Sequence, residues 1–115
     1  MVEQLARVEV DVRGDLGIAR IIGEVDLSNA AVIAKEVEAA VANRAARHVL
    51  DLTQTTHFDS AGIRMLFSLA TLLRERREEL IIVVPASGIV RRILDLTDVA
   101  EVCAVYPSFE AIPPS

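Results

Sequence analysis

Four residues carry the functional groups from which catalytic or metal sites are built: Asp26, His57, Asp59 and Ser60. Two carboxylates, an imidazole and a hydroxyl are the parts of a hydrolase, and carboxylates also bind hard cations. Their arrangement argues against both kinds of site. His57, Asp59 and Ser60 lie in one short stretch, where an oriented nucleophile and base are hard to assemble, and no G-x-S-x-G turn is present. We therefore expect that the protein is not an enzyme and needs no metal or cofactor.

The Ser60 hydroxyl is suited to a different chemistry, modification by a protein kinase. Ser60 follows a polar loop at the start of a predicted helix, with Asp59 before it and Gly62 after it, which leaves its side chain accessible. A phosphate there adds a charge of about −1.5 to −2 at the positive end of the helix dipole, and Arg64 lies one turn away to pair with it. The alternative is structural, because a serine at a helix start commonly caps the helix.

The elements that must position these residues alternate between strand and helix along the chain. A hairpin opens the sequence, because valines alternate with acidic residues before a Gly-Asp turn. We predict strands over residues 8–12, 18–23, 48–52, 80–84 and 102–106, helices over 28–43, 60–77 and 87–95, and a last helical turn over 108–112. This order predicts an α/β sandwich with a mixed, mostly parallel sheet of about five strands and an N-terminal hairpin, packed against three to four helices.

Several details of this fold depend on particular residues. Ser28 or Asn29 is available to cap the first helix, and Ser87 to cap the helix that follows the 80–84 strand. Residues 53–59 are predicted as a loop. The continuous apolar run over 80–84 is typical of a central strand that is covered on both faces. No linker, repeat or low-complexity tract divides the chain, so we expect a single domain over residues 1–115.

The helix over residues 60–77 has an unusually wide apolar face. Its apolar residues span an arc of about 220°, wider than the roughly 100° that a core-facing stripe needs. One explanation is that neighbouring helices cover both flanks. The other is that Met65, with Leu69 or Leu72, reaches a partner-binding patch beside Ser60.

Composition excludes several classes of function. Acidic residues outnumber basic ones by 17 to 12, and the chain has 3% aromatic residues and no Trp. Direct binding of nucleic acid is therefore not expected, because basic charge and stacking platforms are lacking. The longest apolar run, residues 80–86, is far shorter than the roughly 20 residues of a membrane span, so we expect no membrane insertion and a cytoplasmic protein. The single cysteine, Cys103, is expected to be a buried strand residue.

Two short motifs resemble a known family. A strand that ends in Asp-Leu, a polar loop and D-S-x-G at a helix start, here residues 59–62, resemble the signature of STAS-domain anti-sigma factor antagonists. The upstream GEVD, residues 23–26, resembles the second landmark of the family at a matching distance. Element order agrees over essentially the whole chain, although only these two motifs are specific. The resemblance implies a single STAS domain in which Ser60 is the phosphorylated residue.

The resemblance also implies partners and a binding surface. The unphosphorylated form would bind an anti-sigma factor with serine kinase activity and release a sigma factor; phosphorylation of Ser60 would end binding, and a PP2C-type phosphatase would reset it. The expected partner-binding residues are Asp26, Asp59, Ala61, Gly62, Arg64 and Met65. Two positions depart from the family pattern: Ala61 stands where many members have Ser or Thr, and Arg64 where a small residue is common.

Two alternatives stay open at this point. Asp26 could simply shape its own loop through hydrogen bonds to nearby backbone, which is the commoner use of an aspartate before a helix. The chain could also be a STAS subunit or scaffold of another assembly, such as a lipid or anion transport complex or a signalling complex, because one fold hosts many functions. The retained serine favours the kinase-switched class.

Overall fold

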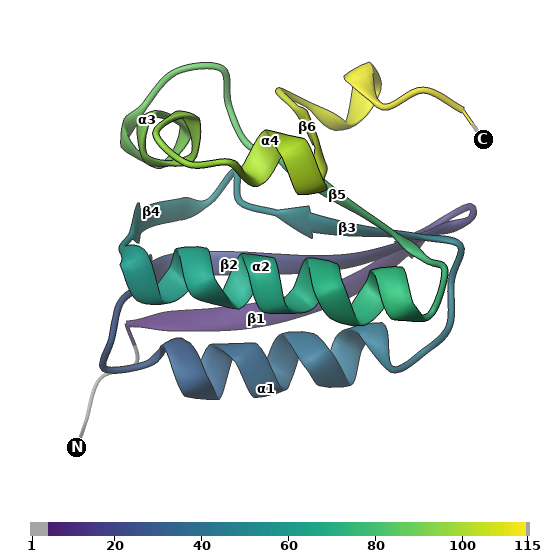
Figure 1. Ribbon diagram of the computed structural model, residues 1–115, viewed down its shortest axis with the longest axis horizontal. Helices are drawn as coiled ribbons and strands as arrows, with labels where there is room; N and C mark the ends of the chain where they lie inside the picture. Colours follow the sequence, from purple (N-terminus) through teal and green to yellow (C-terminus); the bar gives the residue numbers. More distant parts are fainter. Residues whose placement is uncertain (1–4, 115) are drawn as a thin grey trace.

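The computed structural model describes residues 5–114, which form one six-stranded sheet with helices packed against it (Figure 1). The strands are β1 (Ala6–Arg13), β2 (Leu16–Val25), β3 (Arg47–Asp51), β4 (Thr55–Phe58), β5 (Glu79–Val83) and β6 (Ala104–Tyr106). The helices are α1 (Ala30–Val41), α2 (Ser60–Glu75), α3 (Ile89–Asp95) and α4 (Val99–Val102), with a 3₁₀ turn, η1, at Phe109–Ala111. The strand order is β1-β2-β3-β5-β6, with β4 also paired to β2; β1 is antiparallel and the other pairings are parallel. The predicted fold class is confirmed, with one strand more than expected.

Strand β2 changes partner along its length. Residues 16–20 pair with β3, whereas Gly23 to Val25 pair with β4, and the register shifts between Gly23 and Glu24. At this shift Gly23 has a φ of 109°, and the Glu24 amide donates to the Leu5 carbonyl at 2.9 Å. Because β4 runs beside the end of β2, the loops that follow these two strands emerge at the same end of the molecule (Figure 1).

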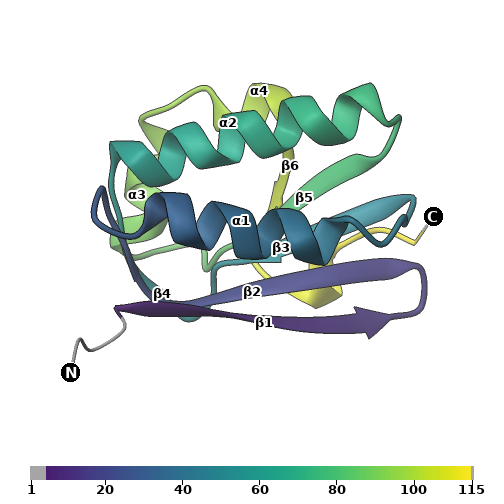
Figure 2. The same cartoon turned by 90° about the horizontal axis from the view of Figure 1, so that it is seen from below.

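The two faces of the sheet are covered by different parts of the chain. Helices α1 and α2 lie side by side on one face (Figure 2), and the larger core between them and the sheet includes Ile33 and Leu66. On the other face, Phe109 and Ile112 pack against a smaller core that includes Ile81. Strand β5 contributes to both cores, so the predicted central strand covered on both faces is confirmed.

Two predicted elements were wrong in detail. Residues 53–59 are not all loop, because Thr55–Phe58 form β4, a strand too short to show a clear alternation of apolar and polar residues. The last strand begins at Ala104, since Val102 ends α4. Cys103 is buried as expected but lies just before the strand, and burial raises the pKa of its thiol to about 11.

The predicted helix caps also differ from the structure. Asn29 occupies the N-cap position of α1, but its side chain makes no capping bond. It accepts from the Asp26 amide at 2.9 Å and donates to the Glu24 carbonyl at 2.8 Å, so it holds the preceding loop instead. Helix α3 begins after Gly88, so Ser87 is not its cap.

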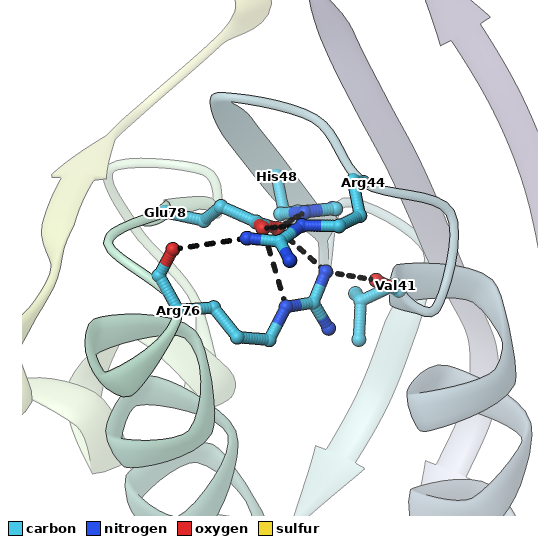
Figure 3. Close-up of polar contacts among 5 residues, drawn as sticks. All are labelled: Val41, Arg44, His48, Arg76 and Glu78. Atoms are coloured by element: carbon cyan, nitrogen blue, oxygen red, sulfur yellow. Dashed lines mark hydrogen bonds and ion pairs between the residues drawn. The ribbon is translucent and has the colours of Figure 1, made fainter.

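Glu78 centres an ion cluster where α2 runs into β5 (Figure 3). Its carboxylate accepts from Arg44 Nε at 2.8 Å and from Arg76 Nη2 at 2.6 Å, and it lies 2.7 Å from His48 Nε2. Arg76 also donates to the Val41 carbonyl at 2.7 Å. With only 5% of the Glu78 side chain exposed, the cluster ties the ends of α1 and α2 to the starts of β3 and β5.

We predict that this cluster makes stability fall in acid. Burial alone would raise the pKa of Glu78, but hydrogen bonds from His48, Arg76 and Arg44 outweigh it and lower the pKa from 4.5 to about 2. A carboxylate with a lower pKa in the folded state stabilises the fold above its unfolded pKa, and this contribution is lost as the pH falls through the folded pKa. Free energies of unfolding from denaturant titrations should therefore drop between about pH 4.5 and 2.

A Glu78→Gln variant separates this carboxylate from the other acidic groups. The variant should be less stable than wild type at neutral pH, because Arg44 and Arg76 then lack the charge they surround. The difference in free energy should shrink as the pH approaches 2, where wild-type Glu78 is itself becoming neutral. A difference that stays constant with pH would show that Glu78 does not cause the acid sensitivity.

Candidate functional site

Ser60 is the first residue of α2, and its side chain is exposed. The helix is capped by the residue before it: Asp59 Oδ1 accepts from the Ala61 amide at 2.8 Å and from the Gly62 amide at 3.3 Å. The alternative that Ser60 itself is the cap is therefore wrong. Within residues 5–114 the Ser60 hydroxyl makes no hydrogen bond, so it is free to react.

The second oxygen of Asp59 connects Ser60 to the loop after β2. Asp59 Oδ2 accepts from the Leu27 amide at 3.1 Å, and the Asp59 amide donates to the Val25 carbonyl at 3.3 Å. One carboxylate thus fixes two segments that are far apart in sequence, the start of α2 and the loop between β2 and α1. The two sequence motifs, residues 23–26 and 59–62, are thereby brought to one site.

Asp26 organises the loop beside Asp59. Its Oδ1 accepts from the Ser28 amide at 2.8 Å and from the Ser28 hydroxyl. The Ser28 hydroxyl, the Ser28 amide and the Asn29 amide lower the pKa of Asp26, with a further contribution from the charge of His57. The loop-shaping role of Asp26 is therefore confirmed, and the same bonds favour the ionised form of its carboxylate in the loop that Asp59 holds.

Gly62 is required by packing and not by its backbone angles. A Cβ added there would lie 2.7 Å from Cε2 of the Phe58 ring, and Phe58 is fully buried. The ring is the last side chain of β4, so the first turn of α2 can approach the sheet only if position 62 has no side chain. This contact gives the glycine of D-S-x-G a physical reason.

We predict that Gly62→Ala destabilises the protein by about 1–3 kcal/mol, because overpacking in a core forces neighbouring side chains out of place. The sign of the change in unfolding free energy is informative, since Gly→Ala inside a helix otherwise stabilises a protein by roughly 0.5–1 kcal/mol. Urea unfolding measures the change. Combining Gly62→Ala with Phe58→Leu, which removes the facing ring edge, should recover part of the loss; no recovery would place the strain elsewhere.

The structure separates the expected partner-binding residues into exposed and buried ones. Arg64 is exposed, and Asp26 and Asp59 are half-buried. Ala61 and Met65 are each 7% exposed and belong to the larger core. Met65 therefore packs inside the molecule, and the hypothesis that it reaches a surface patch is wrong.

Neighbouring elements of the fold, and not a partner-binding patch, explain the wide apolar arc of α2. Leu69 is 4% exposed in the core, and Leu72 is half-buried against it. Helix α2 contacts α1, α4 and the sheet, so neighbouring elements cover its flanks. No apolar patch on α2 is left for a partner among these residues.

Sequence reasoning missed Leu27, which is 77% exposed although it is a leucine. Its amide is held by Asp59, so the side chain stands on a fixed loop next to Ser60. The sequence does indicate an exposed leucine here, because Leu27 lies in the loop between Asp26 and the first helix. A leucine in a short polar loop, outside any periodic pattern, has no obvious core position.

A metal site and a membrane-spanning helix are both absent from the part of the chain that the structure describes. Across positions 5–114, no group of three or more His, Cys, Asp and Glu side chains is arranged to hold a metal ion. His57 is half-buried near Asp26, and its imidazole makes no hydrogen bond to a residue in that range. No helix in the described part of the chain has the length and apolar character to cross a membrane.

Known proteins share this architecture. The family model described as the STAS domain matches residues 7–112. An anti-sigma factor antagonist from Mycobacterium paratuberculosis has a similar structure, with a TM-score of 0.82, 21% identity, and coverage of 91% of this chain and 88% of that one. A putative anti-sigma factor antagonist from Thermotoga maritima has a TM-score of 0.73 and 17% identity, covering 90% and 88%.

The anti-sigma factor antagonist SpoIIAA has a similar structure in its unphosphorylated and phosphorylated forms. The unphosphorylated form has a TM-score of 0.71 and 17% identity, covering 91% of this chain and 92% of that one. The phosphorylated form from Bacillus has a TM-score of 0.65 and 15% identity, covering 91% and 96%. No curated protein sequence matches the chain. Because the family model covers nearly the whole chain, the protein belongs to the STAS domain family, with the fold of the anti-sigma factor antagonists.

Proposed function

We propose that the chain is an anti-sigma factor antagonist whose binding is switched by phosphorylation of Ser60. The observation that carries the proposal is the exposed Ser60 hydroxyl, which is left free because Asp59 caps the helix in its place. A kinase active site needs such a hydroxyl on a fixed, protruding turn. The similar structures described as anti-sigma factor antagonists, one of them in a phosphorylated form, support both the partner class and the modification.

The partner is an anti-sigma factor that is also a serine kinase. It transfers the γ-phosphoryl group of ATP to Ser60 Oγ: the new O–P bond forms, the bond from phosphorus to the bridging oxygen breaks, ADP leaves, and the hydroxyl proton passes to a base of the kinase. A PP2C-type phosphatase restores the hydroxyl by hydrolysis and releases inorganic phosphate. The nucleotide belongs to the kinase, so this domain acts as a binding module without a cofactor and not as an enzyme.

The binding surface surrounds Ser60 at the ends of β2 and β4. Leu27 supplies exposed apolar area, and Asp26, Asp59 and Arg64 supply charge around it. An apolar side chain encircled by polar groups is the usual arrangement of a protein interface. Ala61 and Gly62 contribute through the backbone of the first turn, since their own positions are buried. We place the protein in the cytoplasm, where sigma factors meet RNA polymerase.

Phosphate mapping tests the proposal. The chain is mixed with each serine kinase of the anti-sigma type from its source genome, with ATP and Mg²⁺, and the modified residue is located by mass spectrometry. We expect one phosphate on Ser60 and none on a Ser60→Ala variant. Ser28 is the matched control, because it is also exposed and lies in the adjoining loop, but its hydroxyl is bonded to Asp26.

The other outcomes are equally clear. Phosphate on Ser28 or another residue would contradict the assignment of Ser60. If none of the kinases modifies or binds the chain, the proposal fails, and a role in a transport or signalling assembly becomes the better hypothesis. Hydrolytic activity that Ser60→Ala abolishes would make the protein an enzyme.

A further inference from the structure

We infer that Arg64 holds the phosphate of phosphorylated Ser60 in an intramolecular ion pair. The inference rests on the proposed function for the modification itself, and it concerns what the modified side chain then contacts. Both residues are exposed, and they lie one turn apart on the same face of α2. Residues four apart on a helix have Cβ atoms about 5–6 Å apart, within reach of an arginine and a phosphoserine.

The direction of the helix favours this pair. Side chains of an α-helix lean toward its N-terminus, so the long side chain of Arg64 covers the turn that carries Ser60. An acidic group N-terminal to a basic group at this spacing is the more stable of the two orders. The pair therefore has the favourable orientation as well as the favourable distance.

Two of the backbone amides at the helix start that would otherwise attract a phosphate, those of Ala61 and Gly62, are already in use. Asp59 Oδ1 accepts from the Ala61 and Gly62 amides, and Asp59 Oδ2 accepts from the Leu27 amide. A phosphate on Ser60 therefore meets the Asp59 carboxylate, which already occupies these three amides. It needs a counter-charge from elsewhere.

Arg64 is free to supply that charge. No ion pair or hydrogen bond joins its guanidinium group to residues 5–114, whereas several other arginines of the chain are paired with carboxylates. Asp59 adjoins Ser60 and Asp26 lies in the loop that Asp59 holds, so both carboxylates repel a phosphate; His57 is near Asp26. Arg64 is thus the cation that the helix itself presents to the site.

This pair changes what a partner meets. With Arg64 bound, the phosphate lies along the exposed face of α2 and is partly neutralised. The modified surface then differs from the unmodified one by a phosphate that Arg64 partly neutralises and holds in one orientation. A phosphatase must break the pair before it hydrolyses the phosphate, so the pair should slow dephosphorylation by about twofold at most, as expected for an exposed pair at this spacing.

A phosphate titration tests the inference without any kinase. Phosphoserine is incorporated at position 60 during translation, and the second pKa of its phosphate is followed by ³¹P NMR in wild type, Arg64→Gln and Arg74→Gln. We expect Arg64→Gln to raise that pKa by about 0.3 units, because the dianion loses its partner. Arg74→Gln should not change it, since Arg74 is exposed on the same helix but about 20 Å away.

Thermal unfolding gives a second measurement. Phosphorylation should lower the Tm more in Arg64→Gln than in wild type, and about 1 M salt should reduce the difference. Equal phosphate pKa values in wild type and Arg64→Gln would overturn the inference even if a kinase modifies Ser60. Conversely, Arg64→Gln could raise the phosphate pKa although no kinase modifies the chain. That result would support the ion pair and refute the proposed function.

Discussion

Ser60→Asp should weaken binding of the anti-sigma factor kinase by a factor of tens to thousands. The carboxylate introduces a negative charge beside Asp59 and Asp26, at the centre of the proposed interface. Arg64 offsets this charge only weakly, and a charge that the interface leaves largely uncompensated costs about 2–5 kcal/mol, which corresponds to this loss of affinity. Isothermal titration calorimetry with the kinase that modifies Ser60, in the presence of ADP, measures it.

Three variants separate charge from size and position. Ser60→Asn has the shape of the aspartate without its charge, and Ser60→Ala removes the hydroxyl, so both should bind within about threefold of wild type. Ser68→Asp places the same charge two turns further along the exposed side of α2 and should also bind. If Ser60→Asp binds as tightly as Ser60→Asn, charge at this position is not the switch.

Gly23→Ala should be the most destabilising single-methyl change at a glycine of this protein, by about 3 kcal/mol or more. Its φ of 109° is a conformation that side chains rarely adopt, and the added Cβ would lie 2.2 Å from the carbonyl oxygen of Leu5. The obstacle is backbone, which cannot rotate away as a flexible side chain can. The register shift that brings β4 beside β2 therefore depends on this glycine.

Gly88→Ala is the matched control for Gly23→Ala. Gly88 has nearly the same φ, 110°, but an added Cβ there would have no atom within 4 Å. Gly88→Ala should lower the free energy of unfolding only by the backbone strain, about 1–3 kcal/mol. Urea unfolding of the two variants thus separates strain from collision; equal losses would show that the contact with Leu5 is relieved by a shift of β1.

Gly23→Ala should also affect the site. The loop with Leu27 follows this part of β2 directly, and its connection to Asp59 depends on the pairing of β2 with β4. The Leu27 amide donates a hydrogen bond to Asp59, and its hydrogen exchange should be faster in Gly23→Ala than in Gly88→Ala. The GEVD glycine thus supports the position of the neighbouring D-S-x-G motif.

Local patterns were sufficient to predict most of the fold. The apolar periods of two and of about 3.6 residues located the hairpin, the helices α1 and α2 and the central strand β5, because they record which face of each element is buried. The start of α2 near Ser60 was predicted from the polar loop that precedes it and is confirmed. These features depend on residues within a few positions of one another.

The arrangement of the site was decided by contacts between distant residues. Strand β4 exists because it pairs with β2, and Asp59 caps α2 while also holding Leu27, which lies 32 positions earlier. The burial of Met65 likewise depends on α1 and on the sheet beneath it. A periodic pattern shows that a side chain avoids water, but it does not show what covers it.

The order of the elements, the helix that begins at Ser60 and the charges beside that residue thus follow from local sequence patterns. The roles of Asp59 as the cap, of Ser60 as a free hydroxyl and of Leu27 as its exposed neighbour depend on the folded chain. A hydrogen bond between two loops forms only where the strands β2 and β4 end close together in space. That position follows from the pairing and packing of the whole sheet.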